Sequence, residues 1–274
     1  MLYSELFTSA IKKLNKNELP TAVEILLEKS FGLSRTQFWL KKNQPIRNPN
    51  GLRKFRRLFA RLLKNEPLAY ILEEKEFYSH EFAVSPAVLI PRPETELLVE
   101  KALQLLPSSA WVLDIGAGSG NIAIILALNS NVTVTALEKS KLALAVLKKN
   151  IVRFDLQEKV MAIGGDFFPA QPVLFDMIVS NPPYLSQRDW QNAPPGIKLF
   201  EPKSALVAGP TGTEALEKII AGVPRYLKTG GHLLLEIGQG QHQAVLLFLA
   251  AANLRELECV RDYQGIERVV VACR

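Results

Sequence analysis

The sequence has 274 residues, of which 48% are hydrophobic and 22% charged, and its formal net charge is +6 at pH 7. This composition is typical of a globular protein and excludes a disordered, collagen-like or coiled-coil chain. The two cysteines, Cys259 and Cys273, are too few for a disulfide framework, so we expect a reducing, cytoplasmic setting. The first 17 residues lack the continuous apolar core of a signal peptide, and no apolar run approaches the ~20 residues of a membrane-spanning helix.

Residues 1–75 predict a small, all-helical N-terminal domain. Apolar residues recur at helical spacing in four successive stretches, and Ser34 with Gln37 forms the pattern of a capping box at the start of the third. The domain holds 15 Lys and Arg against 7 Asp and Glu, whereas the rest of the chain holds 18 against 20. Basic residues cover most of the fourth helix outside its apolar stripe, namely Arg53, Lys54, Arg56, Arg57, Arg61 and Lys64. Two interpretations stay open: a solvated helix face, or a docking surface for RNA or a ribosome-associated partner.

Residues 76–92 predict a β-hairpin linker, because apolar residues from Phe77 to Ile90 take strand spacing around a turn at Ser79 and His80. A helix to about Leu106 follows Pro93. Strands and helices then alternate. The predicted strands are Trp111–Ile115, Val132–Leu137, Val160–Ile163, Phe175–Ser180, His232–Ile237, Leu257–Arg261 and Glu267–Ala272, and the helices between them are Ile122–Leu128, Lys141–Ile151, Glu214–Leu227 and Gln241–Asn253.

This alternation predicts an α/β domain at residues 93–274, with a Rossmann-like, doubly wound, seven-stranded sheet. The last two strands should form an antiparallel hairpin at one edge. Ligands of such sheets bind at the carboxyl ends of the strands.

A glycine-rich turn follows the first predicted strand. Asp114 ends that strand, and Gly116, Ala117, Gly118, Ser119 and Gly120 come next, so that the backbone can turn tightly and approach a ligand. Glu138 ends the second strand, where a carboxylate can accept hydrogen bonds from both ribose hydroxyls. Asp166 follows the third strand as an acceptor for an exocyclic amine, with Phe167 and Phe168 as an aromatic wall. With Asp114 attracting an ammonium group directly or through water, these residues outline a site for a nucleoside that carries an amino acid.

Asn181, Pro182, Pro183 and Tyr184 directly follow the strand Phe175–Ser180. The two prolines remove N–H donors and leave carbonyl oxygens as acceptors, and the Asn181 side chain adds another oxygen. A planar NH2 group supplies two donors to such a site, and Tyr184 can stack on it. The pattern therefore favours an amino group conjugated to a flat system, either a carboxamide or a nucleobase amine. No cluster has the spacing of metal ligands, so we expect no metal.

The Asp114–Gly120 loop, Glu138, Asp166 and the Asn-Pro-Pro-Tyr element resemble those of class I S-adenosylmethionine-dependent methyltransferases. The resemblance extends further to the PrmC/HemK family, through Pro67–Ile71, Glu76–Tyr78, Leu89–Glu96, Glu201-Pro202, Ala205-Leu206 and Glu236–Gly238. The family methylates the side-chain amide nitrogen of the glutamine in the Gly-Gly-Gln motif of class I peptide chain release factors.

The resemblance implies that residues 116–120 hold the methionine part of the donor, that Glu138 binds its ribose and that Phe167 flanks its adenine. It also implies that Asn181 contacts donor and acceptor, and that residues 181–184 hold the glutamine amide, with Asn181, Pro182 and Tyr184 as catalytic residues. S-adenosylhomocysteine would be the product. Glu73 stands where the family pattern has a glycine, Glu138 replaces an aspartate and Phe167 a tryptophan.

We therefore predict a monomeric release factor glutamine methyltransferase without an assigned general base. Two alternatives use the same acceptor element: a glutamine methyltransferase acting on a ribosomal protein, and an adenine-amine methyltransferase acting on nucleic acid. Direct nucleic-acid binding is not expected, because residues 76–274 contain no long insertion for reading bases and are slightly acidic.

Overall fold

The computed structural model describes residues 1–14 and 19–274. Residues 15–18, which belong to the predicted helical domain and to the stretch inspected for a signal peptide, lie outside the described residues. The chain forms two units, each described by itself: Met1–Leu72 with Pro195–Phe200, and Glu73–Pro194 with Glu201–Arg274. No helix in the described part of the chain is both long and apolar enough to cross a membrane.

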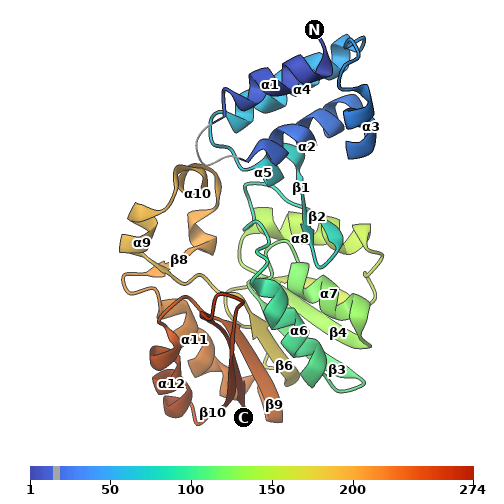
Figure 1. The fold of residues 1–274 in the computed structure, drawn as a ribbon. Coiled ribbons are helices and arrows are strands. Elements are labelled where there is room, and N and C mark those ends of the chain that lie inside the picture. Colours follow the sequence, from blue (N-terminus) through green and yellow to red (C-terminus); the bar gives the residue numbers. More distant parts are fainter. Residues whose placement is uncertain (15–18) are drawn as a thin grey trace. The chain divides into compact units, whose positions relative to one another are not determined.

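The first unit is helical (Figure 1). The capping box at Ser34 is confirmed: Ser34 Oγ accepts from the N–H of Gln37 at 3.2 Å, and Gln37 Oε1 accepts from the N–H of Ser34 at 2.9 Å. Its core is apolar and centres on Leu26, Phe38 and Phe55. The helices are α1 (Tyr3–Ile11), α2 (Pro20–Phe31), α3 (Arg35–Lys41), α4 (Pro49–Leu62), α5 (Leu68–Leu72) and α10 (Pro195–Phe200), the last contributed by a distant part of the sequence.

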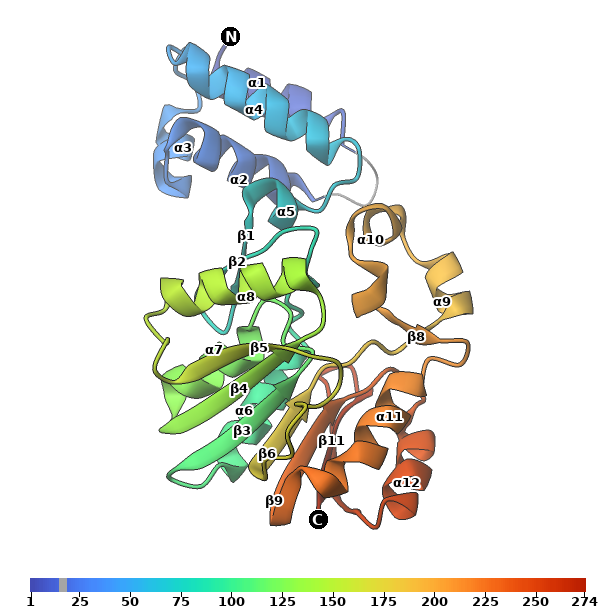
Figure 2. The same ribbon diagram turned by 180° about the vertical axis from the view of Figure 1, so that it is seen from behind.

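The second unit is built around a seven-stranded sheet with the order β10-β11-β9-β6-β3-β4-β5 (Figures 1 and 2). The strands are β3 (Ala110–Ile115), β4 (Val132–Glu138), β5 (Val160–Gly164), β6 (Phe175–Ser180), β9 (Leu227–Glu236), β10 (Arg255–Arg261) and β11 (Glu267–Cys273). Strands β9, β6, β3, β4 and β5 are parallel, whereas β11 runs antiparallel to β9, and β10 antiparallel to β11. The predicted Rossmann-like sheet with an antiparallel edge hairpin is confirmed.

Helices cover both faces of this sheet. One face packs against α6 (Thr95–Leu105), α7 (Asn121–Asn129) and α8 (Lys141–Arg153), and the other against α11 (Glu214–Gly222) and α12 (His242–Ala251). Alternate residues of one strand enter different cores: Val112 of β3 packs on the first face and Leu113 on the second. Burial on both faces explains the consecutive apolar residues in the central strands, such as Met177–Val179 of β6.

Several predicted boundaries were wrong. The helix expected to reach Leu227 ends at Gly222 and continues as a 3₁₀ turn, Val223–Arg225, because Pro224 offers no N–H for an α-helical bond. β9 begins at Leu227, five residues before the predicted start at His232. The prediction missed these residues because Gly230 and Gly231 lie in an irregular stretch of the strand. Five short elements between Tyr184 and Glu214 were not predicted: β7 (Leu185–Ser186), α9 (Gln187–Asn192), α10 (Pro195–Phe200), a 3₁₀ turn (Lys203–Ala205) and β8 (Val207–Gly209).

The hairpin is present but shorter than predicted. It consists of β1 (Glu74–Phe77) and β2 (His80–Ala83), with Tyr78 and Ser79 at positive φ in its turn. The chain then leaves the hairpin, and a turn closed by the hydrogen bond from Val88 N to Ser85 O follows around Pro86. Glu73, which replaces the family's glycine, adopts a φ of +62°, in the left-handed region that glycine occupies most easily.

Candidate active site

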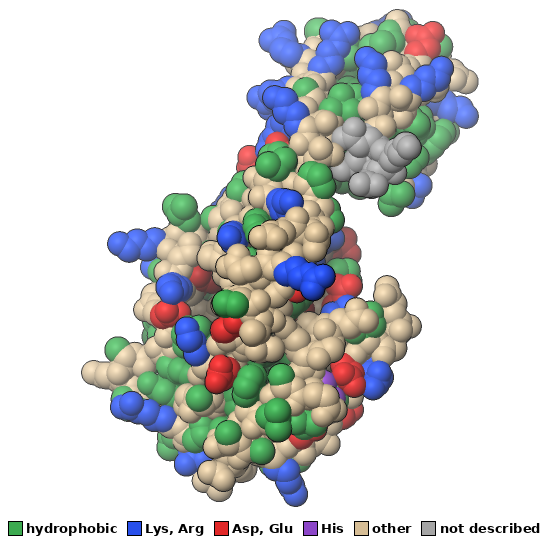
Figure 3. Space-filling model, turned by 90° about the vertical axis from the view of Figure 1, so that its left-hand side faces the viewer, with side chains coloured by type: hydrophobic (Ala, Val, Ile, Leu, Met, Phe, Trp, Pro, Cys, Tyr) green, Lys and Arg blue, Asp and Glu red, His purple; other side chains and the backbone are tan. Residues whose placement is uncertain are grey.

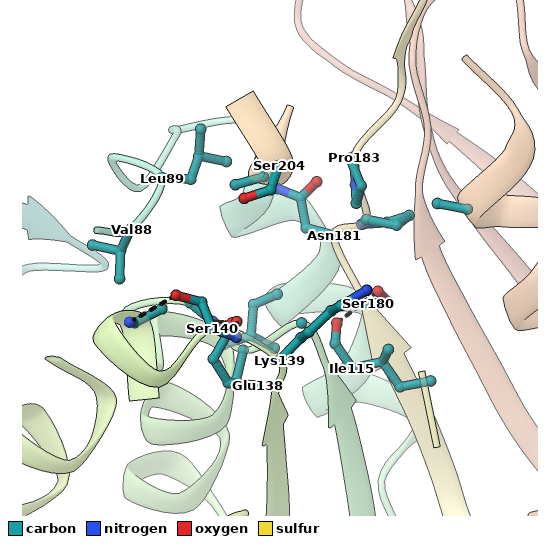
Figure 4. Close-up of a pocket in the computed structure, with 18 of the residues that line it drawn as sticks. Val88, Leu89, Ile115, Glu138, Lys139, Ser140, Ser180, Asn181, Pro183 and Ser204 are labelled. Carbon is teal, nitrogen blue, oxygen red and sulfur yellow. Dashed lines mark hydrogen bonds between the residues drawn. The ribbon is translucent and has the colours of Figure 1, made fainter. Parts of the chain in front are cut away.

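A cavity of about 600 Å³ lies at the carboxyl ends of β3, β4, β5 and β6 (Figure 4). This is where parallel sheets bind their ligands. The structure brings most of the predicted site residues together in its wall, namely Gly116, Ala117, Gly118, Ser119, Glu138, Asp166, Phe167, Asn181, Pro182 and Pro183. Asp114, Gly120 and Tyr184 are not among the described residues that line it.

The three alternating glycines all have positive φ: +73° at Gly116, +56° at Gly118 and +84° at Gly120. A Cβ on Gly116 would meet no described atom within 4 Å, and one on Gly118 would meet only a carbonyl oxygen at 3.9 Å. A Cβ on Gly120 would lie 2.5 Å from Leu147 Cδ1 in α8. The first two glycines therefore leave the backbone open toward a ligand, and the third allows α7 and α8 to pack closely.

Glu138 is held in a fixed orientation at the end of β4. Its Oε2 accepts from the N–H of Gly118 at 2.9 Å, and its Oε1 accepts from the N–H of Ser140 at 2.7 Å. Each carboxylate oxygen can accept a further hydrogen bond. Glu138 therefore offers the cavity two oriented acceptors, as a ribose diol requires.

Asp114 lies beneath the glycine loop and is fully buried. Its Oδ2 accepts from the N–H of Ala123 at 3.2 Å, and its Oδ1 has no hydrogen-bond partner among the described residues. Burial, with a smaller contribution from the negative charge of Glu138, raises the pKa of Asp114 to about 7, against the opposing effect of the hydrogen bond from Ala123. Asp114 does not line the cavity in the structure, so its predicted interaction with a ligand ammonium group, directly or through water, stays a prediction. The side chain joins β3 to the first turn of α7.

Asp166 and Phe167 line the cavity after β5, but Phe168 does not. Phe168 stacks on Tyr226 with ring centroids 4.5 Å apart, so only Phe167 remains from the predicted aromatic wall. Two cations that the sequence did not suggest are also in the wall. Lys139 Nζ pairs with Asp166 Oδ2 at 2.7 Å, and Lys218 Nζ lies 5.6 Å from the centroid of the Phe167 ring.

The Asn-Pro-Pro element follows β6 on the other side of the cavity, opposite Glu138 and Ser140 in Figure 4. Its start is anchored by Ser180, whose Oγ donates to the carbonyl of Ile115 at 2.8 Å. Asn181 Nδ2 donates to Thr95 Oγ1 at 3.0 Å. Asn181 Oδ1 is buried and has no hydrogen-bond partner in the described part of the chain. A residue that lines the cavity thus carries a buried acceptor oxygen without a partner in the described part of the chain.

The position of Tyr184 differs from the one expected from the sequence. Its carbonyl accepts from Gln241 Nε2 at 2.9 Å, and its ring packs beside Gly238, where an added Cβ would lie 3.1 Å from Tyr184 Cδ2. Burial raises the pKa of Tyr184 to about 12, and the charge of Glu236 adds to the rise. Tyr184 is not among the described residues that line the cavity, and its stacking on a planar group of the substrate stays a prediction.

Comparisons with known proteins agree with this geometry. Residues 5–72 match the PrmC N-terminal domain family and residues 93–194 match the methyltransferase small domain family. The release factor glutamine methyltransferase of Bordetella pertussis is 42% identical over 250 residues, which are 89% of this chain and 91% of that protein. The enzyme of the same name from Salmonella typhimurium is 37% identical, over 95% of this chain and 94% of that protein. The chain belongs to the release factor glutamine methyltransferase family.

Solved structures share the fold of this family member. A methyltransferase from Pyrococcus furiosus aligns with a TM-score of 0.52 and 20% identity, covering 78% of this chain and 95% of that one. P. horikoshii TYW2, solved in complex with MeSAdo, aligns with a TM-score of 0.52 and 14% identity, covering 73% and 69%. At these identities the likeness concerns the fold alone.

Residue chemistry alone did not single out four polar side chains beside the family's acceptor element: Thr95, Glu236, Arg92 and Glu201. Thr95 lines the cavity and bridges Asn181 to Glu236, and Arg92 in the wall pairs with the buried Glu201 at 2.5 Å. These four residues belong to the motifs quoted for the family resemblance. The sequence does show a charged residue at the end of an apolar run, since Glu236 follows Leu233–Leu235. No local pattern indicates which residues this side chain would contact.

Proposed function

We propose that this protein transfers a methyl group from S-adenosylmethionine to the side-chain amide nitrogen of the glutamine in the Gly-Gly-Gln motif of class I release factors. The observation that carries the proposal is that Asn181, whose buried Oδ1 has no partner among the described residues, lines the same cavity as the glycine loop and Glu138. One cavity therefore holds acceptors suited to a nucleoside donor and an acceptor suited to a carboxamide NH2. The family relation names the carboxamide.

The residues present fit S-adenosylmethionine. The cavity volume lies within the range of 300–1,000 Å³ typical of small-molecule sites. Gly116 and Gly118 leave room for the methionine part, Glu138 has acceptors for the ribose, and Phe167 offers an aromatic face for the adenine. When bound, the donor supplies a methyl group on a positively charged sulfonium.

Methyl transfer requires the amide nitrogen of the glutamine to act as the nucleophile. That nitrogen is a poor nucleophile because its lone pair is delocalised into the carbonyl group. Acceptance of its hydrogens by Asn181 Oδ1 and the Pro182 carbonyl would orient the lone pair and stabilise the positive charge that grows on nitrogen. Orientation of this kind contributes up to about 7–11 kcal/mol in favourable systems. We assign no general base, because the alkylated nitrogen is acidic and its proton can leave late.

The decisive experiment uses labelled S-adenosylmethionine with an intact class I release factor and with a variant whose Gly-Gly-Gln glutamine is replaced by alanine. We expect label in the first protein only, located on that glutamine by mass spectrometry. Transfer to the alanine variant would show a different acceptor residue. Label that appears only in a ribosomal protein, or in DNA or RNA, would replace this function by one of the two alternatives.

The basic face of α4 supports a second part of the proposal, that the helical unit engages the release factor. Arg53, Arg56 and Arg57 are exposed, and Figure 3 displays Lys and Arg side chains over much of this unit. Class I release factors act on cytoplasmic ribosomes, so the cytoplasm is the proposed setting. We also propose that the protein acts as a monomer.

Charge reversal tests this role without removing the unit. Replacing Arg53, Arg56 and Arg57 by glutamate should weaken methylation of the intact release factor and leave a short Gly-Gly-Gln peptide unaffected. Reversal of Lys148 and Lys149, which are exposed on α8, is the matched control. Equal loss on both substrates, or an equal effect of the control, would remove the role of α4.

A further inference from the structure

A buried chain of three polar side chains ends at the acceptor asparagine. Glu236 is the last residue of β9 and Thr95 the first of α6, and each is only 1% exposed. Thr95 Oγ1 donates to Glu236 Oε2 at 2.7 Å, and Asn181 Nδ2 donates to Thr95 Oγ1 at 3.0 Å. Three segments distant in the sequence therefore meet in one hydrogen-bonded chain.

The donor and acceptor inventory of these groups fixes the direction of every bond. An ionised carboxylate can only accept, so the single hydroxyl proton of Thr95 goes to Glu236. The hydroxyl oxygen then needs a donor on its other side, and Asn181 can meet this need only with its NH2 group. A hydrogen bond from Asn181 to Glu236 itself adds to the same preference. The carbonyl oxygen of the Asn181 amide must then point away from Thr95.

We propose that Thr95 and Glu236 are positioning residues that keep the oxygen, rather than the NH2 group, of Asn181 available to the cavity. The proposal rests on the proposed function, in which a glutamine NH2 donates to that oxygen. If the Asn181 amide were turned over, its NH2 would face the NH2 of the substrate, and two donors would meet. The polarity of one amide therefore decides whether the substrate can be held.

The ionisation of Glu236 sets this polarity. Its surroundings contain Arg268 of β11, Glu94 at the start of α6, and Tyr184 after β6. Burial raises the pKa of Glu236 to about 7, against the opposing effects of the Thr95 hydrogen bond and of Arg268. A protonated Glu236 can donate to Thr95, which frees the Thr95 hydroxyl proton to donate to Asn181 Oδ1. The correct polarity is therefore enforced above the pKa and lost as the pH falls below it.

The pH profile of kcat with a Gly-Gly-Gln peptide tests this role. For wild type we expect kcat to fall about tenfold between pH 8 and pH 6, as a group with a pKa near 7 loses its charge. Glu236→Gln cannot ionise, so its kcat should not show this fall. Asp114→Asn is the matched control, since Asp114 is, among the described residues, a second buried carboxyl group with a pKa of about 7, and its variant should keep the acidic fall. A persistent fall in Glu236→Gln would overturn the proposal.

Threonine substitutions separate positioning from structure. Thr95→Val keeps the shape and removes both hydrogen bonds, so kcat should fall at least tenfold while the affinity for S-adenosylhomocysteine changes little. Thr95→Ser restores the hydroxyl and should recover most of the activity. Wild-type kcat in a folded Thr95→Val variant would contradict the role of the hydroxyl.

A nuclear magnetic resonance measurement keeps the two proposals distinguishable. The side-chain NH2 signals of Asn181 should titrate with a midpoint near pH 7 in wild type and should not do so in Glu236→Gln or Thr95→Val. This readout needs no substrate, so it tests the positioning role even if the release factor is not methylated. Signals that do not respond to pH in wild type would overturn the proposal, whatever the enzyme methylates.

Discussion

Gly120→Ala should destabilise the second unit through two separate effects at one position. Gly120 has a φ of +84°, and alanine in this left-handed region costs about 1 kcal/mol. The added Cβ would also lie 2.5 Å from Leu147 Cδ1 and 3.1 Å from Ile124 Cδ1, both in buried residues. Overpacking of a core typically costs about 1–3 kcal/mol. We therefore expect a total loss of about 3 kcal/mol in the free energy of unfolding.

Gly240→Ala separates the two effects. Gly240 has a φ of +79°, and a Cβ there would meet no described atom within 4 Å, so only the backbone cost of about 1 kcal/mol remains. Urea unfolding of wild type and both variants, followed by circular dichroism, gives the difference. If Gly120→Ala is as stable as Gly240→Ala, the packing of α7 on α8 does not require this glycine. A shifted loop should also weaken donor binding in Gly120→Ala alone.

Three further outcomes follow from the buried and cavity-lining polar groups. Asp114→Asn should flatten the pH dependence of stability. Because the pKa of Asp114 is raised in the folded state, ionisation of the wild-type group lowers the free energy of unfolding, by an amount that grows from about pH 4 to pH 7 up to about 4 kcal/mol. The variant should therefore gain stability relative to wild type at pH 8, which urea unfolding at pH 5 and pH 8 can measure. Asn150→Ala should cost about 3 kcal/mol or more in thermal or urea unfolding, because the Asn150 side chain pairs with the N–H and carbonyl of Ala83 and the carbonyl of Ser119 at 2.8–2.9 Å, all in the buried junction of hairpin and glycine loop. Glu138→Ala should raise the Kd for S-adenosylhomocysteine by about tenfold or more in calorimetry, since the loss of one charged hydrogen-bond acceptor costs about 1.5–3 kcal/mol, whereas an unchanged Kd would remove Glu138 from the donor site.

The sequence predicted the parts of the fold that local patterns determine. Apolar runs within strands, such as Met177–Val179, and the alternation with helices indicate a parallel sheet, because strands covered on both faces carry such runs. Because the carboxyl ends of parallel strands meet at one edge, Glu138, Asp166 and Asn181 could also be placed together from their positions alone.

The features that the sequence did not predict depend on contacts between residues that are distant in the sequence. β9 crosses Gly230 and Gly231, which argue against a strand locally, and its start at Leu227 is defined by a pair with Phe175 of β6 beyond an irregular stretch of the ladder. The short elements between Tyr184 and Glu214 have little periodicity, and α10 packs within the helical unit instead of with its sequence neighbours. Tyr184 turned out to pack beside Gly238, a contact across 54 positions that no local pattern indicates.

The positioning chain is the clearest case of information that only the fold supplies. Thr95 and Asn181 are 86 positions apart, and Thr95 and Glu236 are 141 positions apart. Each residue alone is compatible with a helix start or a strand end. The three residues form one hydrogen-bonded chain only because the fold brings them together in the buried space between α6 and the sheet.

A crystal structure with S-adenosylhomocysteine and a Gly-Gly-Gln peptide tests the central claim most directly. We expect the amide nitrogen of the glutamine to lie within hydrogen-bond distance of Asn181 Oδ1 and to face the sulfur of the spent donor. A peptide that binds with this nitrogen outside the cavity, or an Asn181 that presents its NH2 group to the glutamine, would contradict the account.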